Sequence, residues 1–204
     1  MSKDFSVPAS DDVIKTAKQA LEANGFKVEV VNNLQAAKEK VEELIPEGKE
    51  VFTGTSRTLE DTGLNHVLND SGKYVSAREN FMKFYGQPDK GIDMRRLGSA
   101  SEYAVGSVHA VTEDGQVVIA SASGSQIPNY VYGASNVIWV VGTQKIVKDL
   151  NEAMERLETH TFPLEDERAQ EAYGVHSVIS KVLLYKKDPQ ARITVVFIKE
   201  AVGF

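Results

Sequence analysis

The stretch that decides the fold is VTEDGQVVIASASGSQIPNYVYGASNVIWVVGTQK, residues 111–145. It contains two β-branched, nearly continuously apolar runs, residues 116–121 and 136–141, which are typical of strands buried on both faces of a parallel sheet. We therefore expect the two strands to lie side by side and to point the same way, with a crossover between them. Because ligands bind outside the carboxyl ends of parallel strands, the loop of residues 122–126 is where a site is expected first.

Strand patterns alternate with helix patterns through the rest of the chain. Further strands are expected at residues 26–31, 50–53, 73–77, 103–105 and 192–199. Helices are expected at residues 10–24, 33–45, 146–157, 165–172 and 175–184, with shorter ones near 59 and 81–85. This alternation predicts an α/β fold with a largely parallel sheet covered on both sides. We expect a disordered leader at residues 1–9 and a single domain at residues 10–204.

Composition limits the classes of function. The chain has 204 residues, of which 42% are hydrophobic and 25% charged, as in an ordinary globular domain. No run approaches the roughly 20 apolar residues that span a bilayer, and the first residues do not resemble a signal peptide, so we expect a cytoplasmic protein without membrane contact. A net charge of −6 without any basic block argues against nucleic-acid binding.

The chain contains no cysteine, which excludes disulfides, thiolate nucleophiles and thiolate-held iron–sulfur clusters within it. The spacing of the four histidines does not match a metal site, so we expect no metal and no bound cofactor. GxSxG, P-loop and GxGxxG motifs are absent as well, which argues against serine hydrolases, P-loop ATPases and common dinucleotide enzymes.

One candidate ligand-binding segment is GTSRT, residues 54–58, between an expected strand and an expected helix. Gly54 and the hydroxyls of Ser56 and Thr58 would present hydrogen-bond donors to an anion at the helix start. Since hydroxyls are also the commonest helix caps, capping alone explains the segment equally well.

A second candidate is the small-residue loop after the strand at residues 116–121. Ser123, Gly124 and Ser125 offer hydroxyl and backbone donors for a phosphate or carboxylate, although any tight corner also favours small residues. Lys145 follows the next strand and would neutralise an anion there, whereas a lysine in such a position is usually exposed.

Glu113 and Asp114 are the candidate catalytic residues. Adjacent carboxylates repel each other, so one of them would hold a proton more tightly and act as a general base or as an acyl-transfer nucleophile. The same Glu-Asp-Gly sequence is typical of a tight turn before a strand, and residue types alone favour the turn.

Four motifs together resemble the LUD family, whose members are named for lactate utilisation. The motifs are TSRTLEDTGL (55–64), AVTEDGQVV (110–118), NVIWVVGTQKIVKDLNEAMERL (136–157) and RITVVFIKEAVGF (192–204). The resemblance implies a three-layer α/β/α sandwich similar to glucosamine-6-phosphate deaminase, ribose-5-phosphate isomerase and coenzyme A transferases. In that fold group, acidic residues and glycine-rich loops handle sugar phosphates or acyl-CoA, which corresponds here to Glu113, Asp114 and residues 123–126.

Three functions follow as hypotheses. The resemblance implies an accessory or regulatory component of lactate utilisation, acting with iron–sulfur partner proteins; similar proteins often carry a cysteine-rich segment that is cysteine-free here at residues 173–188. The acidic turn and the hydroxyl-rich loop instead suggest a stand-alone enzyme or binding protein for a small anionic metabolite. The third hypothesis is a homo-oligomeric scaffold that uses the aromatic segment 81–85. This segment would otherwise serve as a lid or simply pack on the domain as a helix.

Overall fold

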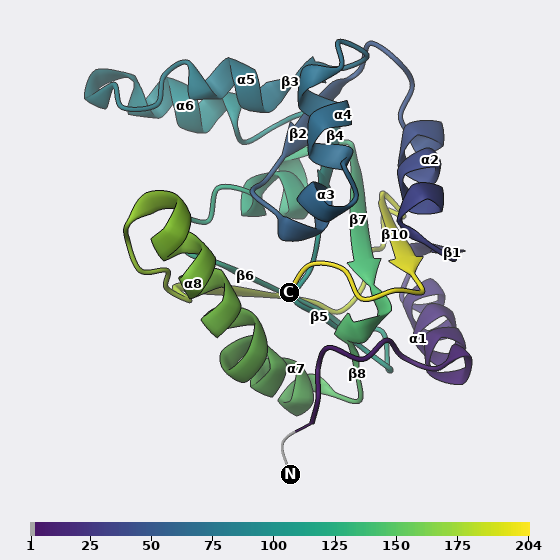
Figure 1. Ribbon diagram of the computed structural model, residues 1–204. Coiled ribbons are helices and arrows are strands. Elements are labelled where there is room, and N and C mark those ends of the chain that lie inside the picture. Colours follow the sequence, from purple (N-terminus) through teal and green to yellow (C-terminus); the bar gives the residue numbers. More distant parts are fainter. Residues whose placement is uncertain (1–2) are drawn as a thin grey trace.

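The computed structural model describes residues 3–204, apart from the side chains at positions 88, 91 and 92. Its centre is a six-stranded sheet with the order β1-β10-β7-β4-β2-β3, in which every neighbouring pair is parallel (Figure 1). The strands are β1 (Lys27–Val31), β2 (Glu50–Thr53), β3 (Val75–Ser76), β4 (Tyr103–Gly106), β7 (Asn136–Gly142) and β10 (Ile193–Ile198).

Helices cover both faces of this sheet. Helices α1 (Asp11–Ala23) and α5 (Ala77–Met82) lie on one face, and α2 (Leu34–Leu44), α3 (Arg57–Asp61) and α4 (Leu64–Asp70) lie on the other. The chain also contains α6 (Gly91–Leu97), α7 (Leu150–Arg156), which packs on the second sheet described below, and α8 (Phe162–Tyr173). Short 3₁₀ and π turns complete the chain: η1 (Pro88–Lys90), η2 (Asn129–Gly133), η3 (Thr143–Lys145) and η4 (Leu157–Thr161). The expected α/β sandwich with a mainly parallel sheet is confirmed.

The core follows from the two-residue period of the buried strand β7. Val137, Trp139 and Val141 pack with α1 on one face, whereas Ile138 and Val140 pack with α2, α3 and α4 on the other. All five side chains are at most 2% exposed. The sheet thus separates two apolar layers, as its continuously apolar sequence predicts.

A second sheet lies beside the first and corrects one expectation. It contains β8 (Ile146–Val147), β5 (Ala110–Thr112), β6 (Val117–Ser121) and β9 (Lys181–Tyr185), in the order β8-β5-β6-β9. Strand β6 pairs antiparallel with β5 and β9, so it is not the parallel neighbour of β7 that the sequence suggested. The tight turn at residues 112–116 folds β6 back onto β5. Because all five residues of β6 are buried, its apolar run resembles that of a parallel strand.

Two expected helices are wrong in part. Residues 181–184 of the expected helix 175–184 belong to the edge strand β9, because the apolar residues Val182, Leu183 and Leu184 fit a strand as well as a helix. The expected helix 146–157 begins only at Leu150, since Ile146 and Val147 pair with β5 as β8 and Asp149 caps the helix.

The ends and the aromatic segment also differ in detail from the simplest expectation. Residues 1–2 of the expected leader lie outside the described residues, whereas Phe5 within it is 4% exposed and packs on the second sheet.

Phe81 of the aromatic segment stacks on Phe52 at 6.0 Å between ring centroids, and Tyr85 is exposed. None of the helices in residues 3–204 combines the length and apolarity needed to cross a bilayer.

Candidate functional site

Three neighbouring strands of the main sheet end at small residues around one cavity. Gly54 follows β2, Gly106 ends β4 and Gly142 ends β7. A Cβ at Gly106 would clash with the Tyr130 hydroxyl, and one at Gly142 would clash with Val202. Glycine therefore lets other segments approach these strand ends closely.

The cavity holds about 300 Å³ and lies between the carboxyl ends of the main sheet and helix α8. Its wall is rich in hydroxyls and amides: Ser56, Thr58, Ser107, Ser121, Ser123, Ser125, Gln126, Thr161 and Ser177. The charged residues that line it are Arg57, Lys145, Glu165 and Arg168, and His109 lines it as well. This volume suits a small metabolite.

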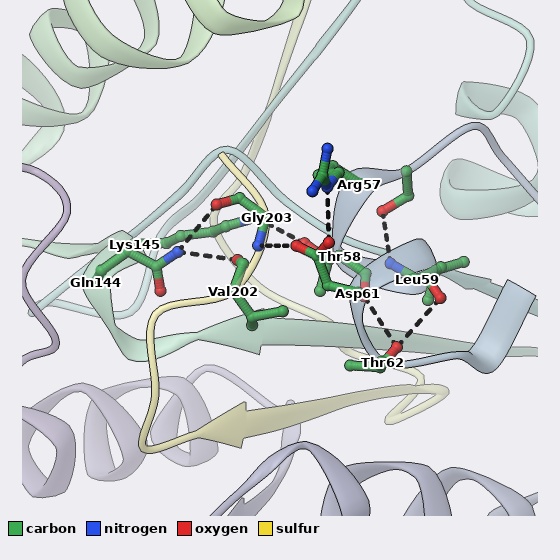
Figure 2. Close-up of polar contacts among 10 residues, drawn as sticks. Arg57, Thr58, Leu59, Asp61, Thr62, Gln144, Lys145, Val202 and Gly203 are labelled. Carbon is green, nitrogen blue, oxygen red and sulfur yellow. Dashed lines mark hydrogen bonds and ion pairs between the residues drawn. The ribbon is translucent and has the colours of Figure 1, made fainter. Parts of the chain in front are cut away.

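Lys145 lies on the inner wall of the cavity, in η3 directly after β7. It is 3% exposed, and its Nζ donates hydrogen bonds to Thr58 Oγ1 at 3.0 Å and to Ser107 Oγ at 3.1 Å. Figure 2 shows the side chain reaching toward Thr58 beside the C-terminal segment. An ammonium group has three N–H donors. Because two of them bond to these hydroxyls, the third is left for a ligand.

Burial lowers the pKa of Lys145 from 10.5 to about 7. The charge of Arg156 lowers this pKa further, whereas the carboxylate of Asp61 raises it. A bound anion would stabilise the charged form in the same way as Asp61 does.

The segment 54–58 combines both roles that its sequence allowed. Ser56 caps α3, accepting a hydrogen bond from the Leu59 amide at 3.4 Å, and Gly54, Ser56 and Thr58 all line the cavity. Thr58 is buried and holds Lys145 as described above.

The last residues of the chain pass directly beside this network (Figure 2). Gln144 Nε2 donates to the Val202 carbonyl at 2.8 Å, and the Gly203 amide donates to Asp61 Oδ2 at 3.1 Å. Gly203 has φ +66°, and a Cβ there would clash with Thr58 Oγ1. Phe204 then lines the cavity, so the tail forms part of the cavity wall and contacts the residues next to Lys145.

The loop at residues 122–126 forms the opposite, open rim. Ser121 Oγ donates to Gln126 Oε1 at 3.0 Å and accepts from the Gly124 amide at 2.8 Å. Ser123 and Ser125 are exposed at the cavity mouth, whereas Gly124 is not among the lining residues. The loop thus reaches the site from the carboxyl end of β6, although β6 belongs to the second sheet.

Behind Lys145 lie the imidazole of His109 and the guanidinium of Arg156, and the charge of Arg156 acts on both Lys145 and His109. His109 lines the cavity; burial and the charges of Lys145 and Arg156 lower its pKa to about 3, so the imidazole is neutral. Its Nδ1 accepts from the Ala120 amide at 3.0 Å, which assigns the proton to Nε2. Burial lowers the pKa of Arg156 to about 10 as well.

Arg156 is fully buried, and only one side of its guanidinium is partnered. Its Nη1 donates to the His109 carbonyl at 2.6 Å and to Thr161 Oγ1 at 2.7 Å, and both partner residues line the cavity. Nε and Nη2, the pair of donors that matches a carboxylate, have no partner among residues 3–204.

Glu113 and Asp114 lie at the far end of the β5–β6 hairpin from the cavity. Asp114 accepts hydrogen bonds from Thr112 and from Gln116, and the hydroxyl of Thr112 holds the pKa of Asp114 below its ordinary value. Neither carboxylate lines the cavity. The structure therefore does not bring them together with the loop at 122–126, and their contacts are those of a tight turn.

Sequence reasoning did not select Ser107, Arg156 or the tail at residues 202–204. Ser107 could have been found, because a glycine followed by a polar residue also ends β2 and β7 at the same edge of the sheet. No local pattern marks Arg156, whose burial results from packing of α7 on the second sheet.

The hydroxyl-rich cavity at the strand ends of this parallel α/β sandwich lies where proteins of this architecture generally bind small molecules. The LUD domain model matches residues 14–199. The chain belongs to the LUD domain family.

One solved structure supports the fold. A DUF162 family protein from Deinococcus radiodurans is similar with a TM-score of 0.56 at 10% identity, covering 94% of this chain and 99% of that one. The β subunit of eIF2B from Chaetomium thermophilum matches with a TM-score of only 0.35 and 11% identity, over 58% of this chain and 44% of that one. Among curated proteins, no significant match is found.

Proposed function

We propose that this chain binds a small organic anion in the cavity at the carboxyl ends of β2, β4 and β7. The observation that carries the proposal is the burial of Lys145 on the cavity wall. Its amine donates hydrogen bonds to Thr58 and Ser107, and its third N–H donor is left for a ligand. A buried cation without an ion pair is costly, and an anionic ligand would remove that cost.

The other charges of the cavity support an anion over a cation. Arg57 pairs with Asp61 at 2.6 Å and Arg168 pairs with Glu165 at 2.7 Å, so the acidic groups at the rim are already neutralised. Farther in, the guanidinium of Arg156 adds positive charge, and His109 adds a neutral imidazole rather than a carboxylate. Backbone and hydroxyl donors from residues 54–58 and 121–126 would complete the binding of a carboxylate or a phosphate.

The wider role that we propose is in lactate utilisation, as an accessory or regulatory component that acts with iron–sulfur partner proteins. Membership of the LUD family supports this role by its name alone. Since the chain has no cysteine, thiolate ligands for a cluster would come from the partner. Purification from cells grown on lactate should recover cluster-bearing proteins, and repeated failure to recover them would count against it.

Ligand-induced stabilisation tests the binding proposal directly. Purified protein is heated with L-lactate, pyruvate or inorganic phosphate, and with glycerol as a neutral control. A bound anion at about a hundred times its Kd adds about 2.7 kcal/mol of stability. We expect the anions to raise Tm while glycerol does not.

Two lysines three positions apart provide the matched variants. Lys145→Met should abolish the shift, whereas Lys148→Met should keep it, because Lys148 is exposed and outside the cavity lining. Equal shifts in both variants, or no shift with any anion, would remove the proposal.

A further inference from the structure

The amine of Lys145 is placed as a nucleophile as well as a cation. Its Nζ lies on the wall of an accessible cavity, within 3.1 Å of two hydroxyls and enclosed by residues from three separate segments. A lysine in apolar or cationic surroundings becomes reactive when its charged form is disfavoured. Here burial and the neighbouring Arg156 have that effect, so a large fraction of the amine is uncharged at neutral pH.

The surroundings of Lys145 also indicate which functional groups a ligand of this amine would carry. The partner of a reactive amine is a carbonyl carbon. The residues that line the cavity also offer partners to a carboxylate on the same ligand. Arg57 and Arg168 are guanidinium cations, and Ser56, Ser123 and Ser125 add hydroxyl donors. A carbonyl next to a carboxylate satisfies both requirements.

We propose that Lys145 forms a covalent imine with a small 2-oxo acid bound in the cavity. This rests on the proposed function, which it extends from anion binding to a reaction class. In the first step the free electron pair of Nζ attacks the carbonyl carbon, a C–N bond forms and the carbonyl π electrons move to the oxygen.

In the second step that oxygen leaves as water. It receives one proton from Nζ and one from solvent, the C–O bond breaks, and the remaining nitrogen electrons form the C=N bond of a cationic iminium. The hydroxyls of Thr58 and Ser107, at 3.0 and 3.1 Å from Nζ, are placed to pass the proton from nitrogen to oxygen. No oxidant or reductant takes part.

Reductive trapping tests this inference. The full chain is incubated near pH 7 with pyruvate or glyoxylate and cyanoborohydride, which reduces an iminium to a stable secondary amine. The intact mass should rise by the mass of the 2-oxo acid less one oxygen atom. Peptide mapping should place the adduct on Lys145 at least about tenfold above any other lysine, since an ordinary lysine is almost wholly protonated at this pH.

Two controls make the result specific. Lys148→Met should label as the unmodified chain does, whereas Lys145→Met should lose the adduct; mapping of the unmodified chain answers the question even where that variant folds poorly. Acetone, a carbonyl compound without charge, should label Lys145 much less than pyruvate does.

Adducts spread evenly over the lysines, or equal labelling by acetone and pyruvate, would overturn the inference. Failure of the inference is distinguishable from failure of the proposed function. If pyruvate raises Tm but forms no adduct, the imine proposal is wrong and the anion-binding proposal still holds. Absence of both the Tm shift and the adduct removes both.

Discussion

Replacing Lys145 by methionine should change how the stability of the protein depends on pH. The pKa of Lys145 is about 7 in the folded chain and returns to about 10.5 on unfolding. Between these values the unfolded chain binds a proton that the folded chain does not. The free energy of unfolding therefore rises with pH in this window, and the contribution is smallest below about pH 7.

The slope for one such proton is about 1.4 kcal/mol per pH unit. Since titration is half complete at the folded pKa, the native chain should gain about 2 kcal/mol relative to Lys145→Met between about pH 7 and pH 9. All other titrating groups cancel in the difference between the two proteins, provided that they do not contact Lys145.

Urea denaturation of both proteins across this pH range measures the difference. Lys148→Met, at an exposed position, serves as the control, and its free energy of unfolding should change with pH as that of the native chain does. A constant difference between native chain and Lys145→Met from pH 7 to pH 9 would show that the pKa of Lys145 is not lowered, and the reasoning about its burial would fail.

Further predictions concern the tail, the neighbouring acid and the turn. Gly203→Ala should destabilise the fold by about 1–3 kcal/mol in urea denaturation and weaken anion binding, because its Cβ clashes with the cavity wall, whereas Gly63→Ala, with φ +69° and open space around it, should cost less and leave binding intact. Asp61→Asn removes a charge that raises the pKa of the buried amine, so the pH midpoint of that amine, measured by NMR, should fall; an unchanged midpoint would contradict this. Asp114→Ala should lower stability by about 1 kcal/mol without changing anion-induced Tm shifts. Glu113→Gln should change neither quantity, and loss of binding in either turn variant would restore a role for the acidic pair.

Much of the fold could be predicted because the main sheet obeys local rules. The run at residues 136–141 is apolar on both faces, and α1 begins at a serine cap and ends at Asn24 and Gly25. The partner of β6 could not be predicted in this way. A strand buried in a small antiparallel sheet has the same composition as one in a parallel sheet, and only the turn at residues 112–116 indicated a hairpin.

The sequence suggested several residues that line the cavity, including Lys145, but it did not suggest that Lys145 is buried. Gly54, Ser56, Thr58 and Lys145 do line one cavity, because strand ends of a parallel sheet meet at one edge. The burial of Lys145 depends on segments far away in sequence, among them the tail that packs on Thr58. Such long-range packing leaves no local pattern, so the sequence suggested an exposed lysine.

The most direct test of the account is the titration of the Lys145 side chain by NMR of the labelled lysine ε-methylene group. We expect this resonance to be absent from Lys145→Met and to titrate with a midpoint near pH 7 in the free protein. Pyruvate or phosphate should move the midpoint upward, because a bound anion stabilises the ammonium. A midpoint near the ordinary lysine value that no anion shifts would contradict a buried, anion-binding amine.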